Sequence, residues 1–231
     1  MNLLALDTST EVLSLALQKG EEWFTSDIMA GQTHSQQILP LIHELLSKTD
    51  LTIQDLQGIA YGEGPGSFTG LRIACGVAQG LAFGAGLPVV GVSTLLALAE
   101  NSGVDKVIAC LDARMGEVYH AIYERKGVEW REISPAMLFK PLEVPVITGE
   151  NWVGVGTGWV TFNAELRAVY KDNISEIKLG ERIYDHPMAK AILQLAKPQF
   201  VAGLGQPAIS AQPVYIRNKV ALKTVERVVR S

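Results

Sequence analysis

Two short segments carry side chains that could do chemistry, and the first is Asp7-Thr8-Ser9. It follows directly on the apolar run Leu3–Leu6, which predicts a β-strand. A carboxylate and hydroxyls at the end of a strand can bind a metal–phosphate group. The same residue types also form Asx and ST turns, in which side chains cap their own backbone. The turn is the favoured interpretation, and Asp7, Thr8 and Ser9 are weak candidates for a cofactor site.

The second segment is the glycine-rich stretch Gly64–Gly70, between a predicted strand and a predicted helix. Free N–H groups at the start of a helix can bind an anion. The stretch lacks the Lys-Ser or Lys-Thr ending of a phosphate-binding loop. Ser67 is also outside the Gly-x-Ser-x-Gly pattern of a nucleophile elbow. Close packing of the backbone is therefore the favoured explanation of these glycines.

Metal-binding and nucleophile motifs are missing from the sequence. His43-Glu44 begins like a zinc-protease motif, but Ser47 stands where the second histidine belongs. Cys75 and Cys110 lie in apolar stretches and are expected to be buried free thiols. We therefore expect no catalytic residue and no metal in the isolated chain. No pair with the spacing that places two imidazoles on one helix face occurs among the histidines, which are His34, His43, His120 and His186.

The first hundred residues predict strands and helices in an α/β order. Three strands joined by tight turns form an antiparallel meander, and the helix after it has the capping-box spacing of Thr33 and Gln36. Ser93 is expected to cap the last helix of this part. The predicted strands are Leu3–Leu6, Val12–Leu17, Trp23–Ile28, Gly58–Tyr61 and Pro88–Val92, and the main helices are Thr33–Ser47 and Phe68–Gly84.

The second half repeats this pattern less clearly, which suggests an internal duplication. Asn101-Ser102-Gly103 predicts a boundary, so we expect one domain over residues 1–100 and another over residues 101–231, whose tail returns to the first. Residues 135–145 are expected to be irregular. The predicted elements here are the strands Val107–Asp112, Glu117–Glu124 and Gly127–Ile133 and the helices Phe162–Tyr170 and His186–Ala196.

The helix Phe68–Gly84 repeats small residues every four positions, in two stripes. Each glycine inside a helix costs about 1 kcal/mol relative to alanine, so close neighbours must offset the loss. One neighbour is the chain's own sheet, and the other is either a second chain or a further part of this one. The first stripe is Gly70, Ala74, Ala78 and Ala82, and the second is Gly76, Gly80 and Gly84.

Composition narrows the function classes. The 231 residues are 48% hydrophobic and carry a net charge of −4, which fits a folded chain without the basic surface of an independent nucleic-acid binder. The tail from Arg217 to Arg230, with Lys219, Lys223 and Arg227, is the one basic stretch. No run approaches the ~18 apolar residues of a membrane span. We expect a cytoplasmic chain without membrane contact.

Several strings resemble the TsaB (YeaZ) family, and together they extend over the whole chain, least distinctively at residues 125–185. They are Ala5–Thr10, His34–Pro40, Gly64–Ile73, Gly91–Leu95, Asp112–Tyr119 and Pro213–Asn218. The resemblance implies an α/β fold of the actin-like, Hsp70-like (ASKHA) and ribonuclease H-like kind, with two related domains whose mixed sheets are flanked by helices.

The resemblance also implies a function. Such a chain is a non-catalytic subunit that pairs with the catalytic homologue TsaD and, with the ATPase TsaE, supports transfer of threonylcarbamoyl to the adenosine next to the tRNA anticodon. ATP or ADP would bind only within the complex, and tRNA only through it. TsaD-like proteins carry a His-x-x-x-His metal site that has no counterpart here.

The first two helices are implied to form the pairing surface, used for a homodimer in isolation and for TsaD in the complex. The residues expected there are His34, Gln37, Ile38, Leu41, Ile42, Leu45, Phe68, Leu71, Arg72, Ala74, Cys75 and Ala78. Two alternatives stay open, an ASKHA-type phosphotransferase and a glycoprotease-like peptidase. The first lacks a glycine in the turn after the first strand, and the second lacks a metal or nucleophile set.

Overall fold

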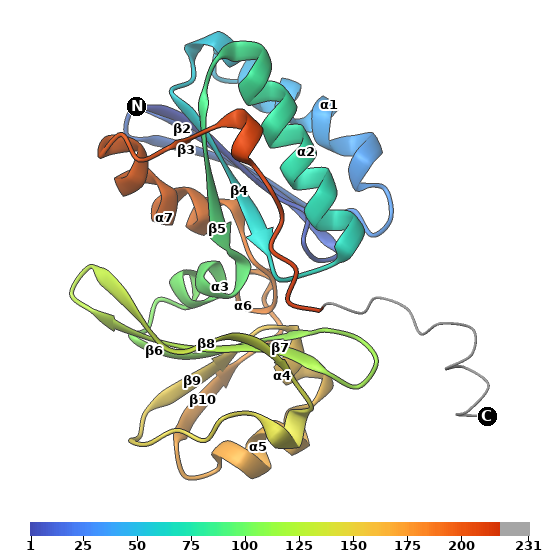
Figure 1. The fold of residues 1–231 in the computed structure, drawn as a ribbon, viewed down its shortest axis with the longest axis vertical. Helices are drawn as coiled ribbons and strands as arrows, with labels where there is room; N and C mark the ends of the chain where they lie inside the picture. Colours follow the sequence, from blue (N-terminus) through green and yellow to red (C-terminus); the bar gives the residue numbers. More distant parts are fainter. Residues whose placement is uncertain (218–231) are drawn as a thin grey trace.

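The computed structural model describes residues 1–217, which form two α/β domains, one above the other in Figure 1. The first domain is built on a six-stranded sheet of order β11-β5-β4-β1-β2-β3. Its first three strands are the predicted antiparallel meander, and β4 and β5 run parallel to β1. The strands are β1 (Asn2–Asp7), β2 (Val12–Lys19), β3 (Glu22–Met29), β4 (Gly58–Gly64), β5 (Pro88–Ser93) and β11 (Gln206–Pro207).

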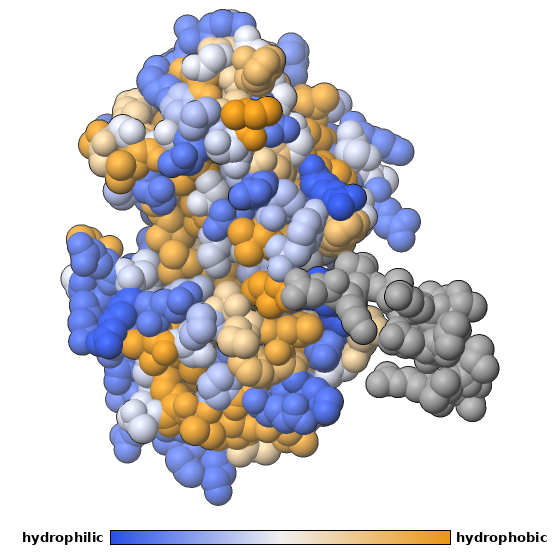
Figure 2. Space-filling model, viewed as in Figure 1, coloured by the Kyte–Doolittle hydropathy of each residue, from blue (hydrophilic) through white to orange (hydrophobic). Residues whose placement is uncertain are grey.

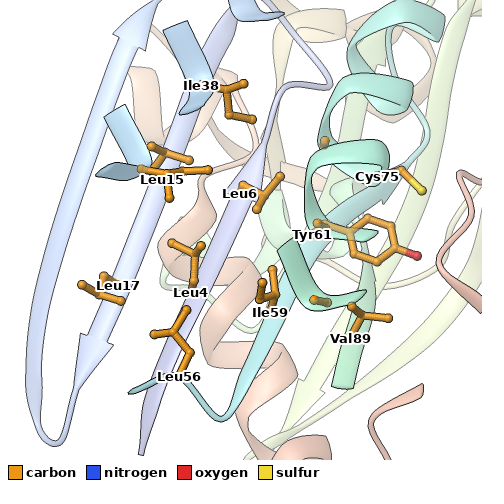
Figure 3. Packing of buried hydrophobic residues seen from close by; sticks show 14 of the residues in the cluster. Leu4, Leu6, Leu15, Leu17, Ile38, Leu56, Ile59, Tyr61, Cys75 and Val89 are labelled. Carbon is orange, nitrogen blue, oxygen red and sulfur yellow. The ribbon is translucent and has the colours of Figure 1, made fainter. Parts of the chain in front are cut away.

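Helices cover both faces of this sheet, which is why β1 and β2 are buried along nearly their whole length. Leu4 and Leu6 point to the side of α1 (His34–Ser47) and α2 (Phe68–Ala85). Leu3 and Ala5, on the opposite face of the same strand, pack under α7 (Ala189–Val201). Figure 3 shows the first of these cores, in which Leu15 of β2 lies near Ile38 of α1, and Tyr61 of β4 lies near Cys75 of α2.

The second domain repeats the topology of the first. Its five-stranded sheet has the order β10-β9-β6-β7-β8, which matches β5-β4-β1-β2-β3 strand for strand. β9 and β10 are parallel to β6, and β7 and β8 are antiparallel neighbours. The predicted duplication is therefore present in the fold. The strands are β6 (Lys106–Asp112), β7 (Val118–Lys126), β8 (Glu129–Phe139), β9 (Trp152–Val155) and β10 (Ile174–Lys178).

One helix, α3 (Thr94–Ser102), lies between the two sheets and packs on both domains. Ala97 belongs to the core of the first domain, whereas Leu95 and Leu98 pack against β6 and β7. The opposite face of the second sheet is covered through Trp159, Leu166 and their neighbours. The remaining short elements are α4 (Thr157–Thr161), α5 (Asn163–Tyr170), α6 (Arg182–Asp185), η1 (Ile53–Asp55), η2 (Pro141–Glu143) and η3 (Ala208–Ser210).

The chain returns to the first domain well before its tail. α7 packs on β1, β2, β4 and β5, and β11 pairs with β5 at the edge of the first sheet. Strands β1 to β5 therefore lie within residues 1–100 and strands β6 to β10 within residues 101–231, while residues 189–215 pack with the first domain. Chain order alone does not reveal this, because an amphipathic helix pattern does not say which sheet it covers.

Some expected local features differ in the structure. The Thr33 capping box is wrong: Thr33 Oγ1 donates to the Ala30 carbonyl at 2.7 Å and caps no helix N–H group. Residues 135–139 continue β8 instead of being irregular, with register shifts between β7 and β8 that accommodate the irregular pairing. Ser93 caps α3 as expected, accepting from the Leu96 N–H group.

The structure contains no helix of sufficient length and apolarity to span a bilayer within residues 1–217.

Candidate functional site

The turn at Asp7–Thr10 lies beneath the glycine-rich stretch, and the two segments were the leading candidates for chemistry. Asp7, Thr8 and Ser9 are at most 2% exposed. Thr8 Oγ1 donates to the Gly70 carbonyl at 2.7 Å, and the Ser67 N–H group donates to the Ser9 carbonyl at 2.7 Å. The sequence brings the two segments together, but as packed backbone and not as an open site.

The Asp7 carboxyl is enclosed by its own chain. Oδ1 accepts from the N–H group and the hydroxyl of Ser9, at 3.0 and 2.8 Å. Oδ2 has no hydrogen-bond partner, and a Cβ atom on Gly62 would lie 1.9 Å from it. Burial raises the pKa of Asp7 to about 6, although the hydrogen bonds from Ser9 lower it. This geometry supports the turn interpretation, because a ligand has no space beside the carboxyl.

The glycines of residues 64–70 are required by close approach. A Cβ atom on Gly70 would lie 1.8 Å from the Thr8 carbonyl oxygen, and one on Gly66 would lie 2.6 Å from the Ser9 carbonyl oxygen. The interpretation of these glycines as packing residues is thus confirmed. Ser67 closes the arrangement as the N-cap of α2, accepting from the Gly70 N–H group.

The two small-residue stripes of α2 face different surroundings. Gly70, Ala74, Ala78 and Ala82 are buried against the sheet of the same chain. Gly76, Gly80 and Gly84 have no atom within 4 Å of an added Cβ and face open space. Packing within the chain therefore explains the first stripe and leaves the second without an intramolecular neighbour.

A pair of point substitutions distinguishes the stripes. We expect Gly70→Ala to lower the free energy of unfolding by about 1–3 kcal/mol or more, because its methyl group collides with backbone. Gly76→Ala should raise it by roughly 0.5–1 kcal/mol, because alanine is the better helix residue and space is open. Denaturant unfolding at low protein concentration measures both. Equal changes in the two variants would contradict the assignment of the stripes.

Most of the predicted interface residues belong to the chain's own core. Leu71, Ala74 and Ala78 are at most 1% exposed, so a partner cannot reach them in this conformation. Their assignment to the pairing surface is corrected: an apolar helix face alone does not show whether sheet or partner covers it. The buried members are His34, Ile38, Ile42, Leu45, Leu71, Ala74, Cys75 and Ala78, and the accessible ones are Gln37, Leu41, Phe68 and Arg72.

A different set of residues forms the exposed face of these helices. Phe83 on α2 and Ile209 on η3 are 74% and 77% exposed, and Leu39 on α1 is 52% exposed. Gly76, Gly80 and Phe83 line a hollow of about 320 Å³ with Gln79 and Ile209. In Figure 2 this side of the first domain is turned to the viewer, and apolar and hydrophilic residues alternate over it. The sequence shows the stripe Gly76, Gly80 and Gly84, but its spacing alone did not indicate that this stripe is the one that faces solvent.

The remaining candidate groups are structural. Cys75 and Cys110 are buried free thiols, and burial raises the pKa of each. His120 is buried beside Tyr170, whose hydroxyl is 2.9 Å from Nε2 and donates to the Pro145 carbonyl, and burial lowers the pKa of His120 to about 3. Among residues 1–217, no three His, Cys, Asp or Glu side chains cluster as metal ligands would.

Arg114 forms a local ion pair with Asp112, at 3.4 Å, in the turn between β6 and β7. It also reaches Glu11 of the first domain at 3.0 Å. Glu117, at the end of the same turn, pairs with Arg217 at 2.6 Å. No local pattern predicts that last contact, because it joins residues a hundred positions apart in the chain.

Two sheets of matching topology, each covered by helices, define a two-domain α/β protein of the ASKHA type. In this chain the residues Asp7, Thr8 and Ser9 of the first-domain turn are buried. Residues 27–223 match the family model of TsaD, tRNA N6-adenosine threonylcarbamoyltransferase. The chain belongs to the TsaB (YeaZ) family. It is 39% identical to the tRNA threonylcarbamoyladenosine biosynthesis protein TsaB of Escherichia coli, over 96% of this chain and 97% of that one.

Further relatives agree with this assignment. The protein of the same name from Haemophilus influenzae is 36% identical, over 96% of each chain. The solved structure of YeaZ from Pseudomonas aeruginosa superposes with a TM-score of 0.84 at 36% identity, covering 93% of this chain and 99% of that one. Sequence and structure therefore place the whole described chain in one family.

Proposed function

We propose that this chain is a non-catalytic partner subunit in the biosynthesis of threonylcarbamoyladenosine in tRNA, and that it activates a TsaD homologue by pairing with it. The family assignment and the names of its relatives support the pathway. The match to the TsaD model supports the pairing, because chains that share a fold can associate through equivalent faces.

The observation that carries the non-catalytic role is the closed turn of the first domain. Asp7, Thr8 and Ser9 are the groups best placed for phosphate or metal chemistry, yet all three are buried and bonded within the chain. A phosphotransferase would need them accessible to its substrate. A peptidase would need an activated nucleophile or metal, whereas the thiols of Cys75 and Cys110 have raised pKa values.

The exposed face of α1 and α2 is the pairing surface of this proposal. Gly76 and Gly80 allow a partner helix to approach closely, since no side chain stands between the backbones. Phe83 and Ile209 supply apolar area beside them, and Leu39 is an exposed apolar side chain of α1. In isolation the same face would join two copies of the chain, and in the complex it would contact the TsaD homologue.

The other components follow from the same proposal. The TsaE ATPase would act on the assembled pair, and ATP or ADP would bind only there. Because tRNA is the substrate, the complex would work in the cytoplasm.

Weak tRNA binding by the isolated chain is a direct expectation. Its net charge is −4, so the release of counterions from the phosphates can add little affinity. The basic tail from Arg217 to Arg230, the one stretch expected to contact RNA, lies outside the described residues except for Arg217. A filter-binding titration at physiological salt should show no submicromolar affinity, and submicromolar binding by this chain alone would contradict the proposal.

Co-expression with the TsaD homologue of the same organism tests the pairing. A tagged copy of this chain should retain that homologue through size-exclusion chromatography as one species. Separate elution of the two proteins at micromolar concentration would contradict the role of a partner subunit.

A further inference from the structure

The segment Gln212–Arg217 leaves η3 and runs along the first domain before it reaches the second (Figure 1). The Gln212 N–H group donates to the Tyr61 hydroxyl at 3.1 Å, and the Val214 N–H group donates to the Glu63 carbonyl at 2.7 Å. A Cβ atom on Gly64 would lie 2.5 Å from the Val214 carbonyl oxygen. The segment is therefore fixed to the end of β4 by backbone bonds and close packing.

Tyr215 fixes the segment to the first turn of α2. Its ring lies against the ring of Phe68, tilted by 34° with the centroids 5.1 Å apart, and its hydroxyl accepts from Arg72 Nε at 2.8 Å. The Arg72 guanidinium lies 3.8 Å from the centre of the Phe68 ring. The same six residues are thus attached to a strand end and to a helix of the first domain.

Arg217 carries the segment into the second domain. Its Nη2 donates to the carbonyls of Ala113 and Arg114, at 3.1 and 3.3 Å, and pairs with Glu117 Oε2 at 2.6 Å. The Arg217 side chain is 14% exposed, so the pair is shielded from solvent. Ile216, next to it, packs against the core formed by α3, β6 and β7.

The turn that Arg217 holds is strained. Arg114 and Met115 have φ values of 63° and 58°, a region that side chains other than glycine rarely adopt. Such a conformation persists only where surrounding contacts impose it. The guanidinium bonded to two carbonyls of this turn is such a contact.

We propose that residues 212–217 are a clasp that fixes the orientation of the two domains, and that Arg217 is the residue that attaches the clasp to the second domain. The chain crosses between the domains at residues 102–106 and again at residues 179–188, and two crossings can act as a hinge. The clasp adds a further attachment, beside the packing of α3 on both domains, that restricts this freedom. The other bridge at these turns, Arg114 to Glu11, is 73% and 59% exposed and contributes little.

The clasp is tested by measuring the distance between the domains in the full chain. Spin labels go on Gln54→Cys in the first domain and Ala168→Cys in the second, both at exposed positions, while the native thiols are buried. Electron–electron resonance should give one narrow distance distribution for the parent chain. Arg217→Ala should broaden or shift that distribution, and Arg217→Lys should do so less, because lysine keeps the charge but loses the planar fork.

Arg114→Ala is the matched control, since it removes an arginine from the turn that Arg217 contacts, with its exposed bridge to Glu11 and its pair with Asp112 inside the turn, and its distribution should stay narrow. Glu117→Gln removes the charge of the pair while keeping an acceptor, and it decides the matter if Arg217→Ala fails to fold. A distribution unchanged from the parent in the folded Arg217 and Glu117 variants would overturn the clasp. If the distance distribution of Arg114→Ala broadens as much as that of Arg217→Ala, the assigned role of Arg217 is overturned.

Discussion

Gly80→Trp is expected to leave the isolated chain folded and to abolish its association with the TsaD homologue. A side chain added at position 80 enters open space on the outer face of α2, so the monomer has room for it. A partner helix that approaches over Gly76 and Gly80 would have no room for this side chain. Overpacking a close helix contact costs about 1–3 kcal/mol or more. Circular dichroism and co-purification measure the two effects, and tRNA modification should be lost with the pairing.

Ala78→Trp is the matched comparison on the inner face of the same helix. Ala78 is fully buried against the sheet, so its replacement should destabilise the monomer itself, and Ala74→Trp should behave likewise. Pairing would then fall only because the fold does. The account of the pairing surface fails if Gly80→Trp pairs normally, or if Ala78→Trp folds normally and loses only the partner.

Asp7→Asn is expected to gain stability over the parent chain as pH rises from about 4 to about 7. The folded-state pKa of about 6 is above the ordinary value of 3.8 for an aspartate, so Asp7 favours folding only while it is protonated. The contribution of protonated Asp7 to the free energy of unfolding is fully present below about pH 4 and is lost as the pH rises through about 6. The difference between 3.8 and about 6 corresponds to about 3 kcal/mol, which the uncharged asparagine does not lose.

Denaturant unfolding of both proteins across this pH range measures the effect as the difference between them. The pH dependence that His120 contributes has the opposite sign. Its pKa is lowered to about 3, so neutral His120 stabilises the fold above pH 6.5, the pKa of an unperturbed histidine, and this contribution is lost as the pH falls. Because both proteins contain His120, its contribution cancels in the difference. A difference that stays constant from pH 4 to 7 would show that Asp7 is not a buried carboxyl.

The turn signals and apolar patterns of the sequence were sufficient to predict the first domain. Strands β1 to β5 and helices α1 to α3 fall within a few residues of their predicted bounds, because glycine, proline and capping residues mark their ends. The return of α7 to the first sheet was not predicted, since a single amphipathic pattern fits either domain. The predicted capping box at Thr33 was wrong, because the Thr33 hydroxyl donates to the carbonyl of Ala30 instead of accepting from an N–H group in the first turn of α1.

The candidate site shows a similar division. The residues of the first-domain turn were identified correctly, and so was the close packing of Gly66 and Gly70 around it. Ala74 and Ala78 were predicted to lie on a pairing surface but are buried against the chain's own sheet, because they satisfy the same spacing as the exposed Gly76 and Gly80. Only three-dimensional packing separates a helix face that meets its own sheet from one that meets solvent. Arg217 and its contacts depend on long-range geometry that no local pattern encodes.

The partner role is tested most directly by reconstituting tRNA modification. The TsaD homologue, the TsaE ATPase, ATP, the threonylcarbamoyl adenylate and unmodified tRNA are combined with this chain, without it, and with its Gly80→Trp variant. We predict threonylcarbamoyladenosine only when the unaltered chain is present, with the variant resembling its omission. Equal modification without the chain would contradict the account.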